Sequence, residues 1–171
     1  MKLPLGQSLI ELLVALVVAT CVLSIGVPQL VRLKDSMEQR SAASSLLSAL
    51  HFARNQAITD RATTSLCHGL SACANTKVWQ GALVIFSDRN GNGSIDGNDA
   101  LLRSLSIPNG YTWRWSGFRS NTRISYAADG TTLTMNGTFT LCQGASPKRQ
   151  IVISLSGRPR IREPAPDAKC S

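Results

Sequence analysis

The chain has 171 residues, of which 43% are hydrophobic and 16% charged, and its formal net charge is +8. This length and apolar content exclude an intrinsically disordered chain and fit one globular domain plus an apolar segment. Residues 114–171 hold nine basic and three acidic residues, whereas residues 1–113 hold nine basic and seven acidic ones. The positive C-terminal third predicts an anionic partner, which composition leaves open as nucleic acid, anionic lipid or acidic glycan.

An apolar segment covers residues 9–27, with Glu11 as its one charged residue. About 20 apolar residues in a helix cross a bilayer core of about 30 Å, so the segment predicts a membrane helix. A charge inside the bilayer costs about 2.5–3.5 kcal/mol, which makes Glu11 a candidate for a function or a partner unless it lies at headgroup depth. A cleaved secretory signal is disfavoured because Lys2 is the only basic residue before the segment and no small-x-small site follows it.

The residues before this helix carry a resemblance. A leader ending in Gly6, then Gln7, Ser8, Leu-Ile-Glu and an apolar helix, resembles the class III signal of type IV pilins and type II secretion pseudopilins. The resemblance implies that a prepilin peptidase removes residues 1–6 by cutting between Gly6 and Gln7, and methylates the new amine. It also implies that Glu11 pairs with a neighbouring subunit's terminal amine, because two charges that are costly in lipid are tolerated as a pair. Gln7 stands where the family usually has Phe or Met.

The helical pattern continues beyond Pro28. Apolar residues recur there at steps of three and four, a pattern typical of an amphipathic helix. They are Met37, Ala43, Leu46, Leu47, Leu50, Ala53, Ala57 and Ile58. We therefore expect one helix of roughly 50 residues, with a transmembrane half at residues 7–28 and an amphipathic half at residues 29–60.

After residue 60 the pattern changes to short β-branched and aromatic runs between Gly, Asn and Asp residues, which predicts strands. The expected strands are residues 64–67, 79–86, 101–105, 111–115, 123–126, 132–135, 137–141, 151–155 and 159–162. Asn136-Gly137 and Ser156-Gly157 are expected hairpin turns. The fold class is therefore α+β, with the long N-terminal helix packed on antiparallel sheet and a globular domain over residues 61–171.

Four of the five cysteines lie in this domain, where disulfides are the default if the domain is exported. Cys67 and Cys73 are spaced to close a short loop, and Cys142 and Cys170 a long one, although four cysteines allow three pairings. A zinc site using His68 is the weaker alternative, because the Cys-x-x-Cys spacing is missing. The fifth cysteine, Cys21, lies in the apolar helix and reads as a small apolar residue.

Residues 88–99 match part of a calcium-binding loop. Oxygen ligands stand at the expected places, with Gly93 sixth. The candidate ligands are Asp88, Asn90, Asn92, Asp96 and Asp99. Against calcium, the last position is Asp instead of a bidentate Glu, and strands flank the loop where an EF-hand has helices. A structural turn is therefore the favoured interpretation, and calcium is the one cofactor that the sequence suggests.

The same region carries a second resemblance. Residues 79–88, the Asn/Gly/Asp loop and residues 99–103 are similar to the GspH/FimT group of the pilin superfamily. The resemblance implies a type IV pilin-like fold and a minor pilin or pseudopilin, not a major subunit.

The C-terminal strand and the residue before it form an extended segment with three arginines at every second position: Arg158, Arg160 and Arg162. Side chains at this spacing share one face of a strand, about 6.5–7 Å apart, and can follow phosphate groups. Lys148 and Arg149 join them if the hairpin brings them close. Gly157-Arg158-Pro159-Arg160 also resembles the DNA-binding signature of FimT minor pilins used in natural transformation. The alternative is an edge strand that its charges guard against aggregation.

Trp113, Arg114 and Trp115, with Phe118, Arg119 and Arg123 nearby, combine aromatic and basic residues that can stack on bases. Strict alternation more often means one buried and one wet face, so we expect the tryptophans in the core. His51 and His68 belong to no catalytic motif, and the chain is not expected to be an enzyme.

The sequence thus predicts a minor type IV pilin that binds double-stranded DNA without sequence specificity during natural transformation. Its expected partners are major and minor pilins, the prepilin peptidase and the bacterial inner membrane, with a periplasmic C-terminal domain before assembly and a pilus location afterwards. The alternatives are a structural initiating minor pilin or type II secretion pseudopilin without DNA binding, and a calcium-dependent binding module.

Overall fold

A computed structural model describes residues 9–132 and 134–170. One long helix, α1 (Leu9–Asp60), is followed by nine strands. They are β1 (Thr64–His68), β2 (Val78–Trp79), β3 (Ala82–Ser87), β4 (Ala100–Ser106), β5 (Tyr111–Gly117), β6 (Arg123–Tyr126), β7 (Gly137–Gln143), β8 (Ser146–Ile153) and β9 (Pro159–Arg162). The chain divides into two compact units, Met1–Glu38 and Gln39–Ser171. The expected leader and the Gly6–Gln7 bond lie outside the described residues.

The first unit contains the N-terminal part of α1, which is long and apolar enough to cross a membrane. Its apolar side chains are exposed on all sides of the helix, and Pro28 lies inside the helix. Glu11 is an exposed residue of the first turn, where a carboxylate interacts favourably with the helix dipole. Lys34 and Glu38 form an i,i+4 ion pair of 3.7 Å near the end of this unit.

The second unit begins with the remainder of α1, whose buried face is built largely of alanine. Fully or nearly buried residues recur along it at helical spacing: Ala42, Ala43, Leu46, Ala49, Leu50, Ala53 and Ala57. Small side chains let the sheets approach the helix closely, because they add little bulk between the backbones. The two ends of the expected stripe are not buried, since Met37 is 63% and Ile58 43% exposed.

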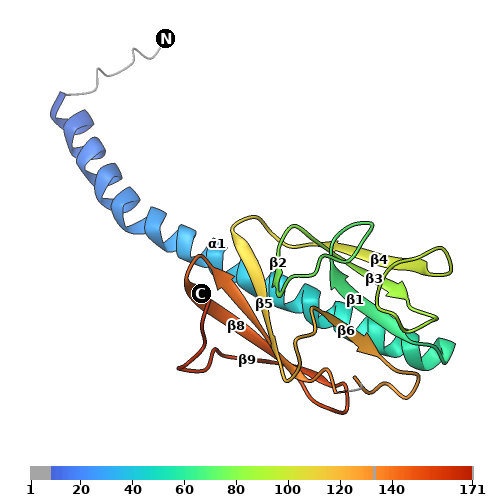
Figure 1. Ribbon diagram of the computed structural model, residues 1–171. Helices are drawn as coiled ribbons and strands as arrows, with labels where there is room; N and C mark the ends of the chain where they lie inside the picture. Colours follow the sequence, from blue (N-terminus) through green and yellow to red (C-terminus); the bar gives the residue numbers. More distant parts are fainter. Residues whose placement is uncertain (1–8, 133, 171) are drawn as a thin grey trace, which may run out of the picture. The chain divides into compact units, whose positions relative to one another are not determined.

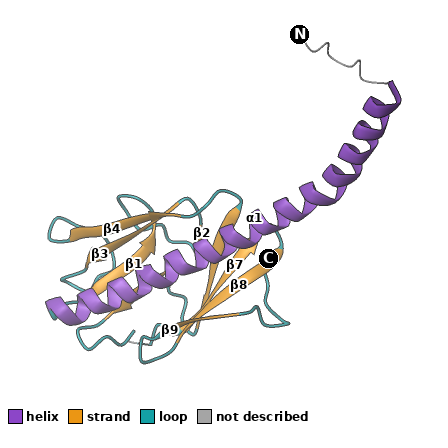
Figure 2. Cartoon of the chain, turned by 180° about the vertical axis from the view of Figure 1, so that it is seen from behind, coloured by secondary structure: helices purple, strands orange, loops and turns teal. Residues whose placement is uncertain are grey.

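Two antiparallel sheets cover this part of the helix, in the orders β4-β3-β1-β6 and β2-β5-β7-β8-β9. The helix lies behind the sheets in Figure 1 and in front of them in Figure 2, so both sheets pack on the same side of it. Their inner faces and the helix share one hydrophobic core. Its centre is Phe139, with ring centroids of Trp79 at 4.7 Å and Trp115 at 4.5 Å. This is the predicted α+β architecture.

Three predicted strands differ in the structure. The predicted strand 151–155 is β8, which begins earlier, at Ser146, and ends at Ile153, because Ser154 accepts the Gly157 N–H in the following turn. The segment 79–86 is not one strand, because Gly81 has a positive φ of 71° and breaks the run, sending β2 and β3 to different sheets. Thr132 and Met135 lie outside any strand, because the Met135 N–H donates to the Thr132 carbonyl and Thr134 has a φ of 75°. Leu133 lies outside the described residues. Asn136-Gly137 is therefore not a hairpin turn, whereas Ser156-Gly157 does join β8 to β9.

Candidate functional site

Strand β9 is an edge strand whose arginines point away from the core. Its partners on β8 are Ile153 for Pro159, Val152 for Arg160, Ile151 for Ile161 and Gln150 for Arg162. Ile151 and Ile153 are buried in the core, so Pro159 and Ile161 share their face of the sheet. Arg160 and Arg162 therefore lie on the opposite, outer face, and both are exposed, as is Arg158 beside the turn. The outer face of the five-stranded sheet is the face opposite the core.

The turn before β9 is fixed by a glycine that no other residue replaces without strain. Gly157 has a φ of 76° and donates its N–H to the Ser154 carbonyl at 2.9 Å. A Cβ at this position would collide with the Gly130 carbonyl and press on the Tyr126 ring. The Gly130 carbonyl in turn accepts a hydrogen bond of 2.9 Å from Arg54 of α1. The turn before Arg158 therefore packs against Gly130, in a loop that Arg54 of α1 holds by a hydrogen bond.

Tyr126, whose ring lies beside this turn, is kept uncharged by burial. Burial raises the pKa of Tyr126, and the positive charge of Arg54 opposes this rise only in part. The phenol is therefore neutral at physiological pH and packs as part of the core.

The five predicted cations do not lie in equivalent surroundings. Arg149 forms an ion pair with Glu163, and its partner on β7 is the core residue Leu141, so it starts from the inner face of the sheet. Arg162 donates its Nε–H to Gln150 Oε1 at 2.9 Å. The side chains of Arg158 and Arg160 make no ion pair or hydrogen bond with the part of the chain that the structure describes.

Lys148 lies where the β7–β8 ladder is irregular. The register shifts between Leu141, opposite Arg149, and Cys142, opposite Pro147, which leaves Lys148 as the extra residue of a bulge. It is half-buried, like Arg149, and separated from the turn by the length of β8. The structure therefore brings Arg158, Arg160 and Arg162 together, and places Lys148 and Arg149 towards the other end of the hairpin.

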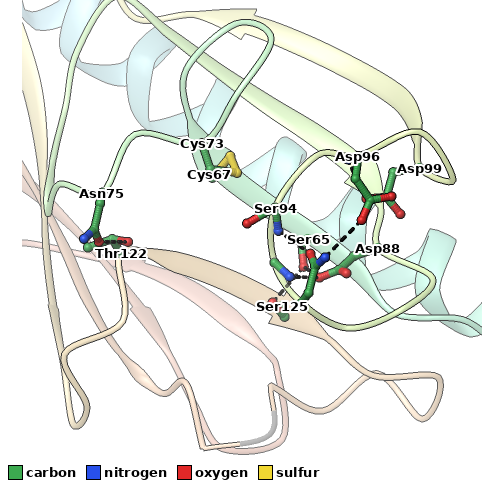
Figure 3. The surroundings of a disulfide bond; sticks show 12 residues. Ser65, Cys67, Cys73, Asn75, Asp88, Ser94, Asp96, Asp99, Thr122 and Ser125 are labelled. Carbon is green, nitrogen blue, oxygen red and sulfur yellow. Dashed lines mark hydrogen bonds between the residues drawn. A yellow bond between two sulfur atoms is a disulfide. The ribbon is translucent and has the colours of Figure 1, made fainter.

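The loop at residues 88–99 is held by hydrogen bonds within it and by one to β1 (Figure 3). Asp88 is fully buried, and its Oδ2 accepts hydrogen bonds from Ser65 Oγ at 2.7 Å and from the Gly93 N–H at 3.0 Å. Asp96 Oδ2 accepts from the side-chain amides of Asn90 at 2.7 Å and Asn92 at 3.0 Å.

Hydrogen bonds also change the pKa of one carboxyl group of the loop. The Asn98 N–H, followed by the Asn90 and Asn92 amides, lowers the pKa of Asp96. Asp99 accepts hydrogen bonds from the backbone N–H groups of Arg89 and Asp96, both at 3.1 Å. Among the described residues, no three His, Cys, Asp or Glu side chains form a group that could hold a metal ion. These internal hydrogen bonds fit the structural turn that the sequence favoured, and calcium binding stays the alternative prediction.

The domain cysteines form the disulfides Cys67–Cys73 and Cys142–Cys170, and Cys21 is free and exposed. This pairing removes the thiolates that a zinc site would need. The second disulfide fastens the C-terminal tail, residues 163–170, to β7. The tail is fastened a second time where the Ala165 N–H donates to Gln150 Oε1 at 3.2 Å.

The tryptophans of β5 lie in the core, as their alternation with Arg114 predicts. Trp113 and Trp115 are 1% and 3% exposed, and Arg114 lies between them on the outer face of the sheet. The sequence pattern placed Arg114 on a wet face, but only the sheet order shows that this face is the one that carries Arg160 and Arg162. Sequence reasoning named Arg114 as part of a candidate stacking stretch but did not connect it with the C-terminal arginines.

Comparison with known proteins gives a family match and a fold match. The family model described as Type II transport protein GspH matches residues 42–157. The fold is similar to two crystal structures of the type IV minor pilin FimU of Pseudomonas aeruginosa strain PAO1, both at 24% sequence identity. In space group P65 the TM-score is 0.53, with 76% of this chain and 95% of that chain covered. In space group P21 the TM-score is 0.59, with 80% and 96% covered. No curated protein matches the chain.

Proposed function

The chain belongs to the GspH family of type II transport proteins and is a minor pilin or pseudopilin, and from this premise we propose that it binds double-stranded DNA through Arg158, in the turn before β9, and Arg160 of β9. Pilins and pseudopilins are structural proteins that associate with other pilins. The apolar helix and the pilin fold fit a single-pass inner-membrane protein with a soluble C-terminal domain. In our proposal the assembled protein captures DNA at the pilus or its tip during natural transformation.

The observation that carries this proposal is the pair of exposed arginines at an edge strand, Arg158 just before β9 and Arg160 within it. Neither guanidinium is neutralised by a carboxylate among the described residues, so both retain their full charge for an external anion. Guanidinium groups match phosphate oxygens with two parallel hydrogen bonds, which favours arginine over lysine at such a surface. Contacts to the phosphate backbone of DNA do not distinguish one base sequence from another. We therefore expect binding that is insensitive to DNA sequence and sensitive to salt.

The anchoring and processing steps belong to the same proposal. A prepilin peptidase cuts between Gly6 and Gln7 and methylates the new amine, and Glu11 then pairs with a neighbouring subunit's amine as the helix leaves the membrane. This explains why a charged residue is kept in a segment where each charge costs about 2.5–3.5 kcal/mol. The domain faces the periplasm before assembly.

The test is DNA binding by the full chain in detergent micelles. We expect the double variant R158Q/R160Q to weaken affinity for a 30-base-pair duplex roughly 10- to 100-fold and to lower the salt slope by about 2, one unit for each lost phosphate contact. R89Q is the control, because it removes an exposed arginine from the loop between β3 and β4 of the four-stranded sheet.

Two results would contradict the proposal. Binding that is equal in R158Q/R160Q and in R89Q would move the DNA surface elsewhere. Undetectable binding by the wild-type chain at low salt would favour the alternative, in which the arginines face an acidic surface of a neighbouring subunit in an initiating minor pilin or a secretion pseudopilin.

A further inference from the structure

A groove of about 390 Å³ lies between the outer face of the five-stranded sheet and the C-terminal tail. Side chains of four neighbouring strands line it, from Arg114 on β5 to Arg162 on β9. In Figures 1 and 2 the chain end returns from β9 to the strands of this sheet. The function proposed above uses only the outer edge of this surface, at Arg158 and Arg160.

Strand register places two basic residues of the groove, Arg114 and Arg162, in one row across the sheet. Arg114 lies opposite Thr140, Thr140 opposite Gln150, and Gln150 opposite Arg162. Strands lie about 4.8 Å apart, so the two arginines flank a gap of roughly 14 Å between their Cα atoms. Polar side chains of Thr140 and Gln150 form the floor between them. The row therefore has a cation at each end and hydrogen-bonding groups in the middle.

The floor is already ordered by its own hydrogen bonds. Gln150 Nε2 donates to Thr140 Oγ1 at 3.0 Å, and Gln150 Oε1 accepts from Arg162 Nε and from the Ala165 N–H. Gln150 is buried, so these bonds are shielded from water. One side chain thus fixes Arg162 on one side and the tail on the other, and the remaining N–H groups of the Arg162 guanidinium are left for a ligand.

The tail supplies a third cation. Lys169 lines the groove one residue before Cys170, whose disulfide to Cys142 fixes this part of the tail on β7. Asp167 is the one carboxylate in the lining, against three cations. The side chains of Arg114 and Lys169 make no ion pair or hydrogen bond within the described ranges 9–132 and 134–170. Uncompensated cations around a polar, ordered floor favour an anionic ligand with several acceptor oxygens.

We propose that this groove binds a phosphate group through Arg114, Arg162 and Lys169. Its occupant is a phosphodiester of the DNA, an assignment that rests on the proposed function, because Arg160 and Arg162 stand on the same face of β9 and join the groove to the edge. A DNA strand that contacts Arg158 and Arg160 then continues across the sheet towards Arg114. The tail forms one wall of its path.

The first experiment tests the groove without duplex DNA. The dinucleotide d(TpT), which carries a single phosphodiester, is titrated into the full chain in micelles while the arginine Nε–H signals are followed by NMR. We expect saturable shifts at Arg114 and Arg162 that are lost in K169Q and, for Arg162, in R114Q. We expect D167N to bind the dinucleotide more tightly, because the one repelling carboxylate is removed. Shifts that are absent, or unchanged in both R114Q and K169Q, overturn the phosphate site.

The second experiment tests the occupant with the 30-base-pair duplex. R114Q is expected to weaken affinity about three- to tenfold and to lower the salt slope by about 1, with R89Q again as the control. If R158Q/R160Q abolishes duplex binding while R114Q behaves like R89Q, the groove proposal is wrong and the proposed function stands. If the wild-type chain binds d(TpT) in the groove but no duplex, DNA is not the occupant and the proposed function fails. Equal unfolding midpoints for R114Q, K169Q and the wild type show that the variants are folded.

Discussion

Arginines of the same strand and hairpin differ in what their side chains already contact. Arg149 is paired with Glu163, and Arg162 is held by Gln150, whereas Arg158 and Arg160 are exposed without such partners among the described residues. A paired cation must give up its carboxylate before it can hold a phosphate, so its net gain is smaller. The local contacts of each arginine, and not the number of arginines, therefore decide how well it can bind a phosphate, and Arg158 and Arg160 come before Arg149.

Asp96 gives a pH-dependent contribution whose sign follows from its hydrogen bonds. Its pKa in the folded chain lies below the ordinary value of 3.8, because three N–H donors favour the charged carboxylate. The stabilisation is therefore fully present above pH 3.8 and is lost as the pH falls through the folded pKa.

We predict that D96N lowers the melting temperature of the full chain at pH 6, because an amide replaces one acceptor oxygen with a donor that faces the Asn90 and Asn92 amides. The difference between D96N and wild type should shrink on acidification to pH 3. Melting curves at the two pH values measure it, and a difference that grows on acidification would show that the hydrogen-bonded carboxylate does not stabilise the loop.

At the scale of elements, β9 depends on the turn that precedes it. The strand has four residues and pairs on one side only, with β8. Short edge strands with charged residues resist pairing with other chains, and β9 has both features. Its position is set by Gly157, whose left-handed backbone and close approach to Gly130 leave no room for a side chain.

We predict that G157A destabilises the chain more than G144A, the matched control in the turn between β7 and β8. Both glycines have positive φ, and an alanine there costs about 1–2 kcal/mol. Only at Gly157 does the new methyl group also collide with backbone, whereas the space around Gly144 is open. Urea unfolding, followed by the fluorescence of the buried tryptophans, compares the two variants. Equal unfolding midpoints would show that close packing against Gly130 does not restrict position 157.

At the scale of the whole molecule, the apolar helix segment and the arginine surface belong to different compact units. The proposed assembly contact, Glu11, lies in the first unit, and β9 lies in the second. Changes in one unit should therefore leave the chemistry of the other intact.

We predict that E11A strongly reduces the protein in sheared pilus fractions, because the carboxylate that pairs with the neighbouring amine is missing. The purified E11A chain should keep both disulfides and bind duplex DNA with unchanged affinity, since β9 is untouched. Immunoblots of sheared and membrane fractions, with E11D as the charge-preserving control, measure assembly. Normal recovery of E11A in the pilus fraction would remove the assembly role of Glu11.

The sequence predicted the elements that have a strong local period. The apolar run and the stripe at three- and four-residue steps gave one helix that ends near residue 60, and β-branched runs gave most of the strands. It failed in the segments 79–86 and 132–135, where Gly81 and Thr134 have a left-handed backbone. Propensity describes an average over neighbours, and a single φ > 0 overrides it.

By itself, the sequence determined the long helix, the α+β class and the three arginines at alternate positions, because helical and strand periods depend only on residue spacing. Only the tertiary structure decided the pairing of the cysteines, the division of the strands into two sheets and the neutralisation of Arg149 by Glu163. It also brought Arg114 and Lys169 into one groove with Arg162, although 48 residues separate the two arginines along the chain. Strand order and the path of the tail set such distances, and both follow from the packing of the whole core rather than from any local pattern.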